Sequence, residues 1–71
     1  MEKIVAEFGN FIKEKRIEKG LSQAEMAKKL NISQQAYSRY ELGTREAGLQ
    51  MILDIAEILG FKPGEFFNRY I

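Results

Sequence analysis

The 71-residue chain contains no cysteine, no histidine and only one proline. The absence of cysteine excludes disulfides, thiolate zinc sites and a cysteine nucleophile. The absence of histidine removes the usual general base and the commonest metal ligand. No apolar run approaches the roughly 18 residues that a membrane span needs, and the first residues lack the apolar block of a signal peptide. We therefore expect a soluble, cytoplasmic protein that binds a partner, holds no metal or cofactor, and is not an enzyme.

The composition is that of a folded protein, and its charge is unevenly distributed. Hydrophobic residues make up 45% of the chain and charged residues 30%, and a chain of this length predicts a single domain over residues 1–71. Residues 1–45 hold nine Lys and Arg against six Asp and Glu, whereas residues 46–71 hold two against four. A basic first part and a mildly acidic second part favour a small nucleic-acid binder with a protein-contact surface near its C-terminus.

Apolar residues recur at intervals of three and four, which is the spacing of amphipathic helices. Residues that tolerate left-handed backbone mark the expected helix ends: Gly20, Asn31, Gly43 and Gly60. Alternation typical of a strand never persists. The pattern predicts an all-α fold with five helices, at about residues 2–19, 23–30, 34–42, 49–59 and 63–69.

The second and third helices are separated by a turn of about three residues, which is the spacing of a helix-turn-helix. Ser22 and Glu25 form a capping box before the second helix, and Ser33 caps the third. In a helix-turn-helix the second of the two helices enters the major groove of DNA. The segment 34–42 is therefore the candidate recognition helix.

The candidate recognition helix has two different faces. Its inner face carries Ala36 and two tyrosines, while its outer face carries neither acidic nor apolar residues but four polar ones: Gln34, Gln35, Ser38 and Arg39. Glutamine pairs with adenine and arginine with guanine in the major groove. This pattern predicts that the outer face contacts base edges.

The chain resembles the phage repressor/Cro-type helix-turn-helix family, also called the xenobiotic-response-element family, over about residues 8–68. The resemblance is carried by the segments GLSQAEMA (20–27), ISQQ (32–35) and SRYELG (38–43). It implies a five-helix DNA-binding domain that acts as a homodimer on double-stranded operator DNA. Tyr37 and Tyr40 depart from the usual aliphatic residues, so their hydroxyls must reach an edge of the core or a partner.

The resemblance also implies roles for individual residues. The base-contacting positions correspond to Gln34, Gln35, Ser38 and Arg39. The phosphate-contacting positions correspond to Ser22, Gln23, Ser33, Thr44 and Arg45. Helix N-termini support phosphate binding because their backbone N–H groups are free.

A structural ion pair is expected between Arg16 and Glu41. Arg16 follows Phe8 and Ile12 by steps of four, which places it on or beside the buried face of the first helix. A charge there needs a partner, and Glu41, one turn after Tyr37, is the natural candidate. The family has such a pair at these positions. We expect it to orient the recognition helix, and Arg16 can also touch a phosphate.

The C-terminal segment has more large apolar residues than one short helix can bury. We expect the surplus to form a two-fold dimer interface, with contributions from Phe61, Phe66, Phe67, Tyr70 and Ile71.

Two functions from different classes are compatible with these patterns. The leading interpretation is a sequence-specific DNA-binding transcriptional regulator, a repressor, that binds a dyad-symmetric operator as a homodimer. The alternative is a protein-interaction module of the same fold, antitoxin-like or an anti-regulator. A protein-binding version is expected to place apolar or acidic residues on the outer face of segment 34–42.

Overall fold

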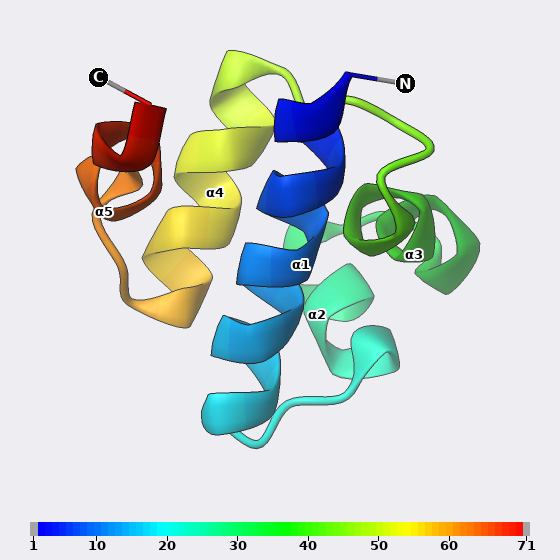
Figure 1. The fold of residues 1–71 in the computed structure, drawn as a ribbon. Coiled ribbons are helices and arrows are strands. Elements are labelled where there is room, and N and C mark those ends of the chain that lie inside the picture. The colour runs from blue at the N-terminus through cyan, green and yellow to red at the C-terminus, as the bar shows by residue number, and fades with distance from the viewer. Residues whose placement is uncertain (1, 71) are drawn as a thin grey trace.

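The computed structural model describes the backbone of residues 2–70 and the side chains of residues 2–69. The predicted all-α fold with five helices is confirmed, and residues 2–70 contain no strand. The last predicted helix ends early and continues as a 3₁₀ turn. In chain order (Figure 1), the elements are α1 (Lys3–Glu18), α2 (Gln23–Leu30), α3 (Gln34–Leu42), α4 (Leu49–Leu59), α5 (Pro63–Phe67) and η1 (Asn68–Tyr70).

The starts of α2 and α3 are fixed by serine caps. Ser22 Oγ accepts from the Glu25 backbone N–H at 3.0 Å, and the Glu25 carboxylate accepts from the Ser22 N–H at 3.0 Å. The hydrogen bond from the Ser22 backbone lowers the pKa of the exposed Glu25 carboxyl. Ser33 Oγ accepts from the Ala36 N–H at 3.0 Å. Asn31, at a φ of 60°, ends α2 in left-handed backbone, so the turn between the two helices is tightly specified.

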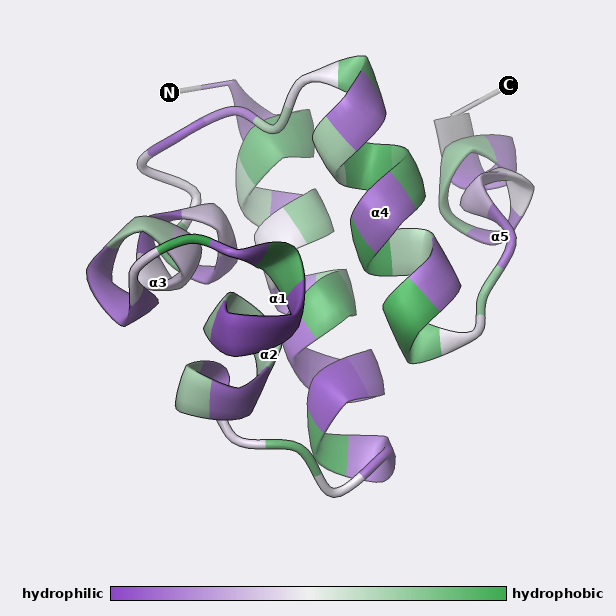
Figure 2. Cartoon of the chain, turned by 180° about the vertical axis from the view of Figure 1, so that it is seen from behind, coloured by the Kyte–Doolittle hydropathy of each residue, from purple (hydrophilic) through white to green (hydrophobic). Residues whose placement is uncertain are grey.

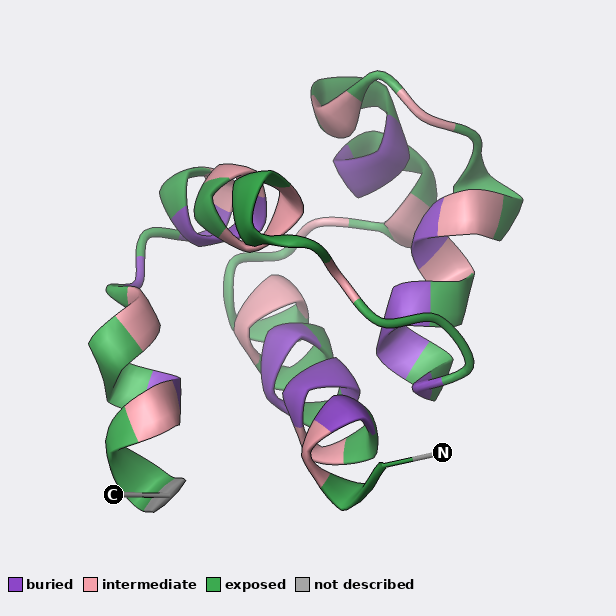
Figure 3. Ribbon diagram, turned by 90° about the horizontal axis from the view of Figure 1, so that it is seen from above, coloured by how far each residue is buried: buried purple, intermediate pink, exposed green. Residues whose placement is uncertain are grey.

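The long helix α1 packs against α3 and α4, α2 packs against both α3 and α4, and α5 packs against α4 (Figure 1). Burial is confined to one side of each helix (Figure 3). The buried side chains of all five helices form one hydrophobic cluster, whose largest fully buried members are Tyr37, Phe66, Ile12, Met26 and Ile55. The buried face of α1 is thus part of the core, and α3 is held against α1.

A glycine allows α1 and α3 to cross closely. A Cβ atom on Gly9 would collide with the backbone carbonyl oxygens of Tyr40 and Glu41. Any larger residue would therefore push α3 away from α1. The position of the candidate recognition helix depends on this contact, which was not predicted from the sequence.

Two of the predicted dimer-interface residues belong instead to the core. Phe61 is 6% exposed and packs edge-on against Phe11, with ring centroids 4.9 Å apart. Phe66 is fully buried and meets Phe8 at 5.2 Å between centroids. The prediction was wrong for these two because both rings pack against the phenylalanine rings of α1. Phe67 remains half-buried. The Tyr70 side chain and Ile71 lie outside the described residues.

Candidate nucleic-acid interface

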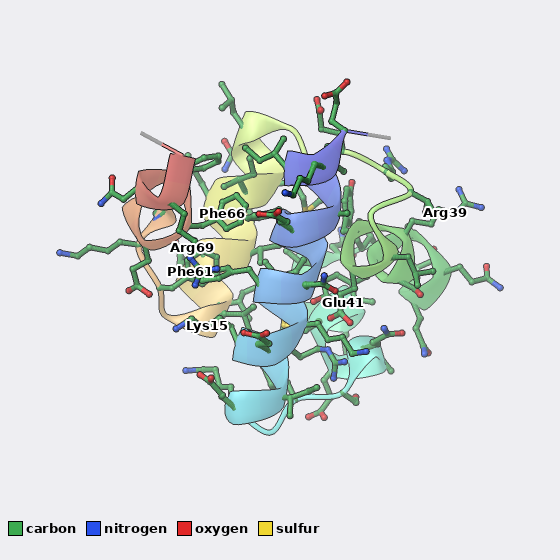
Figure 4. The ribbon with its side chains drawn as sticks, viewed as in Figure 1. Lys15, Arg39, Glu41, Phe61, Phe66 and Arg69 are labelled. Atoms are coloured by element: carbon green, nitrogen blue, oxygen red, sulfur yellow. The ribbon has the colours of Figure 1, made fainter. Side chains whose placement is uncertain are left out.

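The outer face of α3 presents polar side chains to solvent. Gln34, Gln35 and Arg39 are exposed and Ser38 is half-buried. Together with Gln23 from α2 and Leu42 from the end of α3, they line one open hollow. The outer sides of α2 and α3 are largely hydrophilic (Figure 2), and Arg39 projects from α3 on the side away from α1 (Figure 4). The structure thus brings the four predicted base-contacting residues to one surface.

The inner face of α3 is anchored by a network around the Glu41 carboxylate. Arg16 Nε donates to Glu41 Oε2 at 2.6 Å, and Arg16 Nη2 donates to Oε1 at 3.2 Å. The Tyr37 hydroxyl donates to Oε2 at 2.6 Å. The side chain of Glu41 is 2% exposed and that of Arg16 is 12% exposed. The structure therefore brings the predicted ion pair together and supplies the partner that the Tyr37 hydroxyl needs.

Two further contacts complete this network, and neither was predicted from the sequence. Arg16 Nη1 donates to the Leu21 carbonyl at 2.7 Å, so the guanidinium also fixes the loop before α2. The Gln23 amide donates through Nε2 to Glu41 Oε1 at 3.0 Å. A buried carboxylate is stable only when hydrogen-bond donors satisfy both of its oxygens. The network thereby ties α1, α2 and α3 to one carboxylate.

The pKa values in the network follow from these contacts. Burial disfavours the charged form of Glu41, but hydrogen bonds from Arg16, Tyr37 and Gln23 outweigh it and keep the carboxyl pKa below its usual value. The hydrogen bond to Glu41 raises the pKa of Arg16. Burial, followed by the hydrogen bond to Glu41, raises the pKa of Tyr37. At neutral pH the network therefore holds an ionised pair and a neutral tyrosine.

The predicted phosphate-contacting residues lie at the helix ends that flank the hollow. The Ser22 and Ser33 oxygens accept cap hydrogen bonds, and each hydroxyl still has a proton to donate. One amide proton of Gln23 is used by Glu41, which leaves the second for another acceptor. These three side chains retain donors suited to phosphate oxygens.

Thr44 and Arg45 follow α3 in the exposed loop before α4. Thr44 Oγ1 donates to the Arg39 carbonyl at 3.4 Å, and its backbone N–H donates to the same carbonyl at 3.1 Å. The Arg45 guanidinium lies over the Tyr40 ring, 5.5 Å from its centroid. Stacking on Tyr40 orients the Arg45 charge beside α3.

One apolar side chain on the outer face was missed from the sequence. Leu42 is 70% exposed and lines the same hollow as Gln34 and Arg39. The expectation that this face holds no apolar residue was therefore wrong. Leu42 was considered only as the last residue of the helix. Because it follows Ser38 by four positions, its side chain lies on the same outer face as Ser38.

Other kinds of site are not evident in the described part of the chain. No group of three or more Asp and Glu residues between 2 and 70 is placed to hold a metal ion. None of the described helices is both long and apolar enough to cross a membrane.

Comparison with known families agrees with this geometry. The helix-turn-helix family model HTH_3 matches residues 12–66, which covers the hollow and its supporting network. The chain belongs to the Cro/C1-type helix-turn-helix family.

Three relatives from Bacillus subtilis (strain 168) illustrate the family. The SPbeta prophage-derived HTH-type transcriptional regulator YonR is 42% identical over 75% of this chain and 49% of its own length. The HTH-type transcriptional regulator YqaE is 42% identical over 73% of this chain and 45% of its own length. YqaF, also named an HTH-type transcriptional regulator, is 39% identical over 82% of this chain and 76% of its own. The chain thus spans about half the length of the first two relatives.

A solved structure has the same helix-turn-helix fold. The crystal structure of the clp gene regulator ClgR from C. glutamicum superposes with a TM-score of 0.85 and covers 96% of this chain and 88% of that one. The two sequences are 19% identical, so the similarity concerns the fold.

Proposed function

We propose that this helix-turn-helix protein is a sequence-specific DNA-binding transcriptional regulator, and specifically a repressor, with α3 as its recognition helix. The observation that carries the proposal is that the polar side chains of Gln34, Gln35 and Arg39 are exposed and make no contacts with other described residues that would occupy their donors. All three are exposed, and none makes a side-chain hydrogen bond or ion pair with another described residue. Side chains with unused donors on an anchored helix are suited to base edges in the major groove.

The surrounding groups support binding to the DNA backbone. Hydroxyl and amide donors at the N-terminal ends of α2 and α3 can contact phosphates on either side of the groove. Arg45 adds a positive charge beside the far end of α3. Phosphate contacts position the protein, and the residues of α3 then select the sequence. A repressor of this kind acts by occupying an operator.

The test is selection of bound sites from a random duplex library, followed by titration across a salt series. We expect one enriched motif, and an affinity for random duplex that falls steeply as salt increases. Equal recovery of all sequences, or salt-independent binding, would contradict the proposal. Absence of DNA binding with retained binding to a protein partner would favour the protein-interaction alternative.

The proposal includes a homodimer on a dyad-symmetric operator, with half-sites about 34 Å apart. A two-fold interface must be self-complementary. An apolar groove of about 370 Å³, formed by the start of α1, the start of α4 and α5, has Ile4, Ile52 and Phe67 in its walls. Leu49, 84% exposed, stands at the same groove, where a two-fold axis would bring it to the groove of a second copy.

Sedimentation of the protein, alone and on DNA, tests this interface. Leu49→Glu is expected to abolish dimers, whereas Ile17→Glu, at an exposed position on α1, is the matched control. One monomer per duplex at saturation, on a site without dyad symmetry, would contradict the homodimer.

A further inference from the structure

Leu42 is an apolar residue in the middle of a polar surface. It follows Ser38 by four residues and Arg39 by three, and a helix turns by about 100° per residue. Its direction from the helix axis therefore falls between those of Gln34 and Arg39. Among the side chains that line the hollow it is the one large aliphatic group, and it remains 70% exposed.

The fold does not require a leucine at this place. The helix end is set by Gly43, whose N–H donates to the Tyr40 carbonyl at 3.3 Å, and by Thr44, whose N–H donates to the Arg39 carbonyl at 3.1 Å. Both are backbone contacts that do not use the Leu42 side chain. The core beneath α3 is filled by Tyr37 and Tyr40. The side chain is thus free to contact a ligand held by the polar residues around it.

The chemistry of the major groove identifies that contact. Its base edges carry donors, acceptors and one apolar group, the 5-methyl of thymine. When the glutamines and Arg39 contact base edges, the Leu42 side chain on the same face is also brought against the DNA and is removed from water. This burial is favourable when the side chain packs against an apolar group. Gln34 and Leu42 are eight residues apart, which is about 12 Å along the helix, so the two side chains reach different base pairs.

We infer that Leu42 is a specificity-determining residue that contacts the 5-methyl group of a thymine in a base pair other than the one contacted by Gln34. This inference rests on the proposed function, because it assigns one more base preference to the same recognition helix. The contact makes that base pair a T·A pair in each half-site.

The experiment removes the methyl group from the DNA and the side chain from the protein. Each thymine of the selected site is replaced in turn by deoxyuridine, which lacks only the methyl group. Affinity is then measured for the wild type and for Leu42→Ala. At one position we expect deoxyuridine to weaken wild-type binding about fourfold, the effect of exposing one buried methyl group. Leu42→Ala is expected to bind both duplexes equally.

Two controls make the outcome specific to this contact. Leu53→Ala, at an exposed position on α4, is expected to keep the full deoxyuridine effect. Thermal unfolding of Leu42→Ala is expected to match the wild type, since the side chain is mostly exposed. Site selection repeated with Leu42→Ala is expected to lose the thymine preference at that position and no other.

The outcomes separate this inference from the proposed function. If the protein selects a motif but no deoxyuridine position depends on Leu42, the inference is overturned and the recognition role of α3 stands. Leu42 would then be available to a protein partner. If the protein selects no motif, both are overturned.

Discussion

The inner and outer faces of α3 differ in how their polar groups are satisfied. On the inner face, the Glu41 carboxylate accepts from Arg16, Tyr37 and Gln23, and no buried side-chain N or O atom between residues 2 and 69 lacks a partner. On the outer face, Gln34 and Arg39 have no such partner among the described residues. On one side of α3, therefore, all buried polar side chains have hydrogen-bond partners. On the other side, the donors of Gln34 and Arg39 have no protein partner among the described residues.

The buried network fixes the orientation of α3 against α1, and so it also fixes where the exposed polar side chains of α3 begin. Burial of the ion pair contributes little net stability compared with an apolar core, but breaking it is costly. The helix is thus held in one orientation while its outer residues remain available. Breaking the inner network should therefore change the outer face, whereas removing an outer side chain should leave the inner network intact.

The largest effect is expected from breaking the ion pair. Arg16→Ala or Glu41→Ala should each cost about 3–5 kcal/mol of unfolding free energy, because the remaining charge is left buried and unpaired. The double variant should cost less than the sum of the two. Chemical denaturation of all four proteins measures this coupling. Lys13→Ala, at an exposed position on α1, should change little, and additive losses would show that the pair is not coupled.

A smaller loss is expected from Gly9→Ala. Its Cβ would meet the backbone of Tyr40 and Glu41, so α3 must shift, at about 1–3 kcal/mol. DNA affinity should fall as well, although no DNA-facing residue has changed. Gly48→Ala is the matched control, since a Cβ there meets nothing within 4 Å. Wild-type melting and binding in Gly9→Ala would contradict the close approach of α1 and α3.

The pH dependence of stability should report the Glu41 network. The pKa of Glu41 is lower in the folded protein than its ordinary value, so its stabilisation is present above the unfolded pKa of about 4.3 and is lost as the pH falls further. Unfolding free energies measured from pH 7 to pH 3 should therefore decline at the acid end. Glu41→Gln is expected to flatten this decline. An identical slope in the two proteins would exclude the network as its source.

The smallest effect is expected on the DNA side, at Arg45. Arg45→Ala should weaken binding to all sequences similarly and reduce the salt slope by about one, as expected for one lost phosphate contact. Protein stability should remain close to wild type because the residue is exposed. Lys62→Ala, a charge removed before α5, should leave the slope unchanged. An unchanged slope in Arg45→Ala would remove Arg45 from the phosphate contacts.

The sequence predicted most of the fold because its signals are local. Capping serines, Asn31 and the terminal glycines specify helix ends within a few residues, and α2, α3 and α4 have the predicted bounds. The Arg16–Glu41 pair was predictable because a charge on a buried face requires a partner.

The failures concern contacts between elements that are distant in the chain. Phe61 and Phe66 looked like a surplus because the sequence does not show that their rings pack against Phe8 and Phe11. The Gly9 contact and the Gln23–Glu41 hydrogen bond depend on how helices cross. The spacing of residues along the chain carries no information about such crossings. The exposure of Leu42 on the outer face was predictable, because it follows Ser38 by four residues and therefore lies on the same face of α3.

The most direct test of the account is the ratio of affinities for the selected site and a scrambled duplex, measured for Gln34→Ala, Gln35→Ala and Arg39→Ala. Each variant should lose about 1–3 kcal/mol on the selected site. The two glutamine variants should keep wild-type affinity for the scrambled duplex, since they carry no charge. All three should unfold as the wild type does. A specificity ratio that stays at the wild-type value in both glutamine variants would contradict the claim that the outer face of α3 selects the sequence.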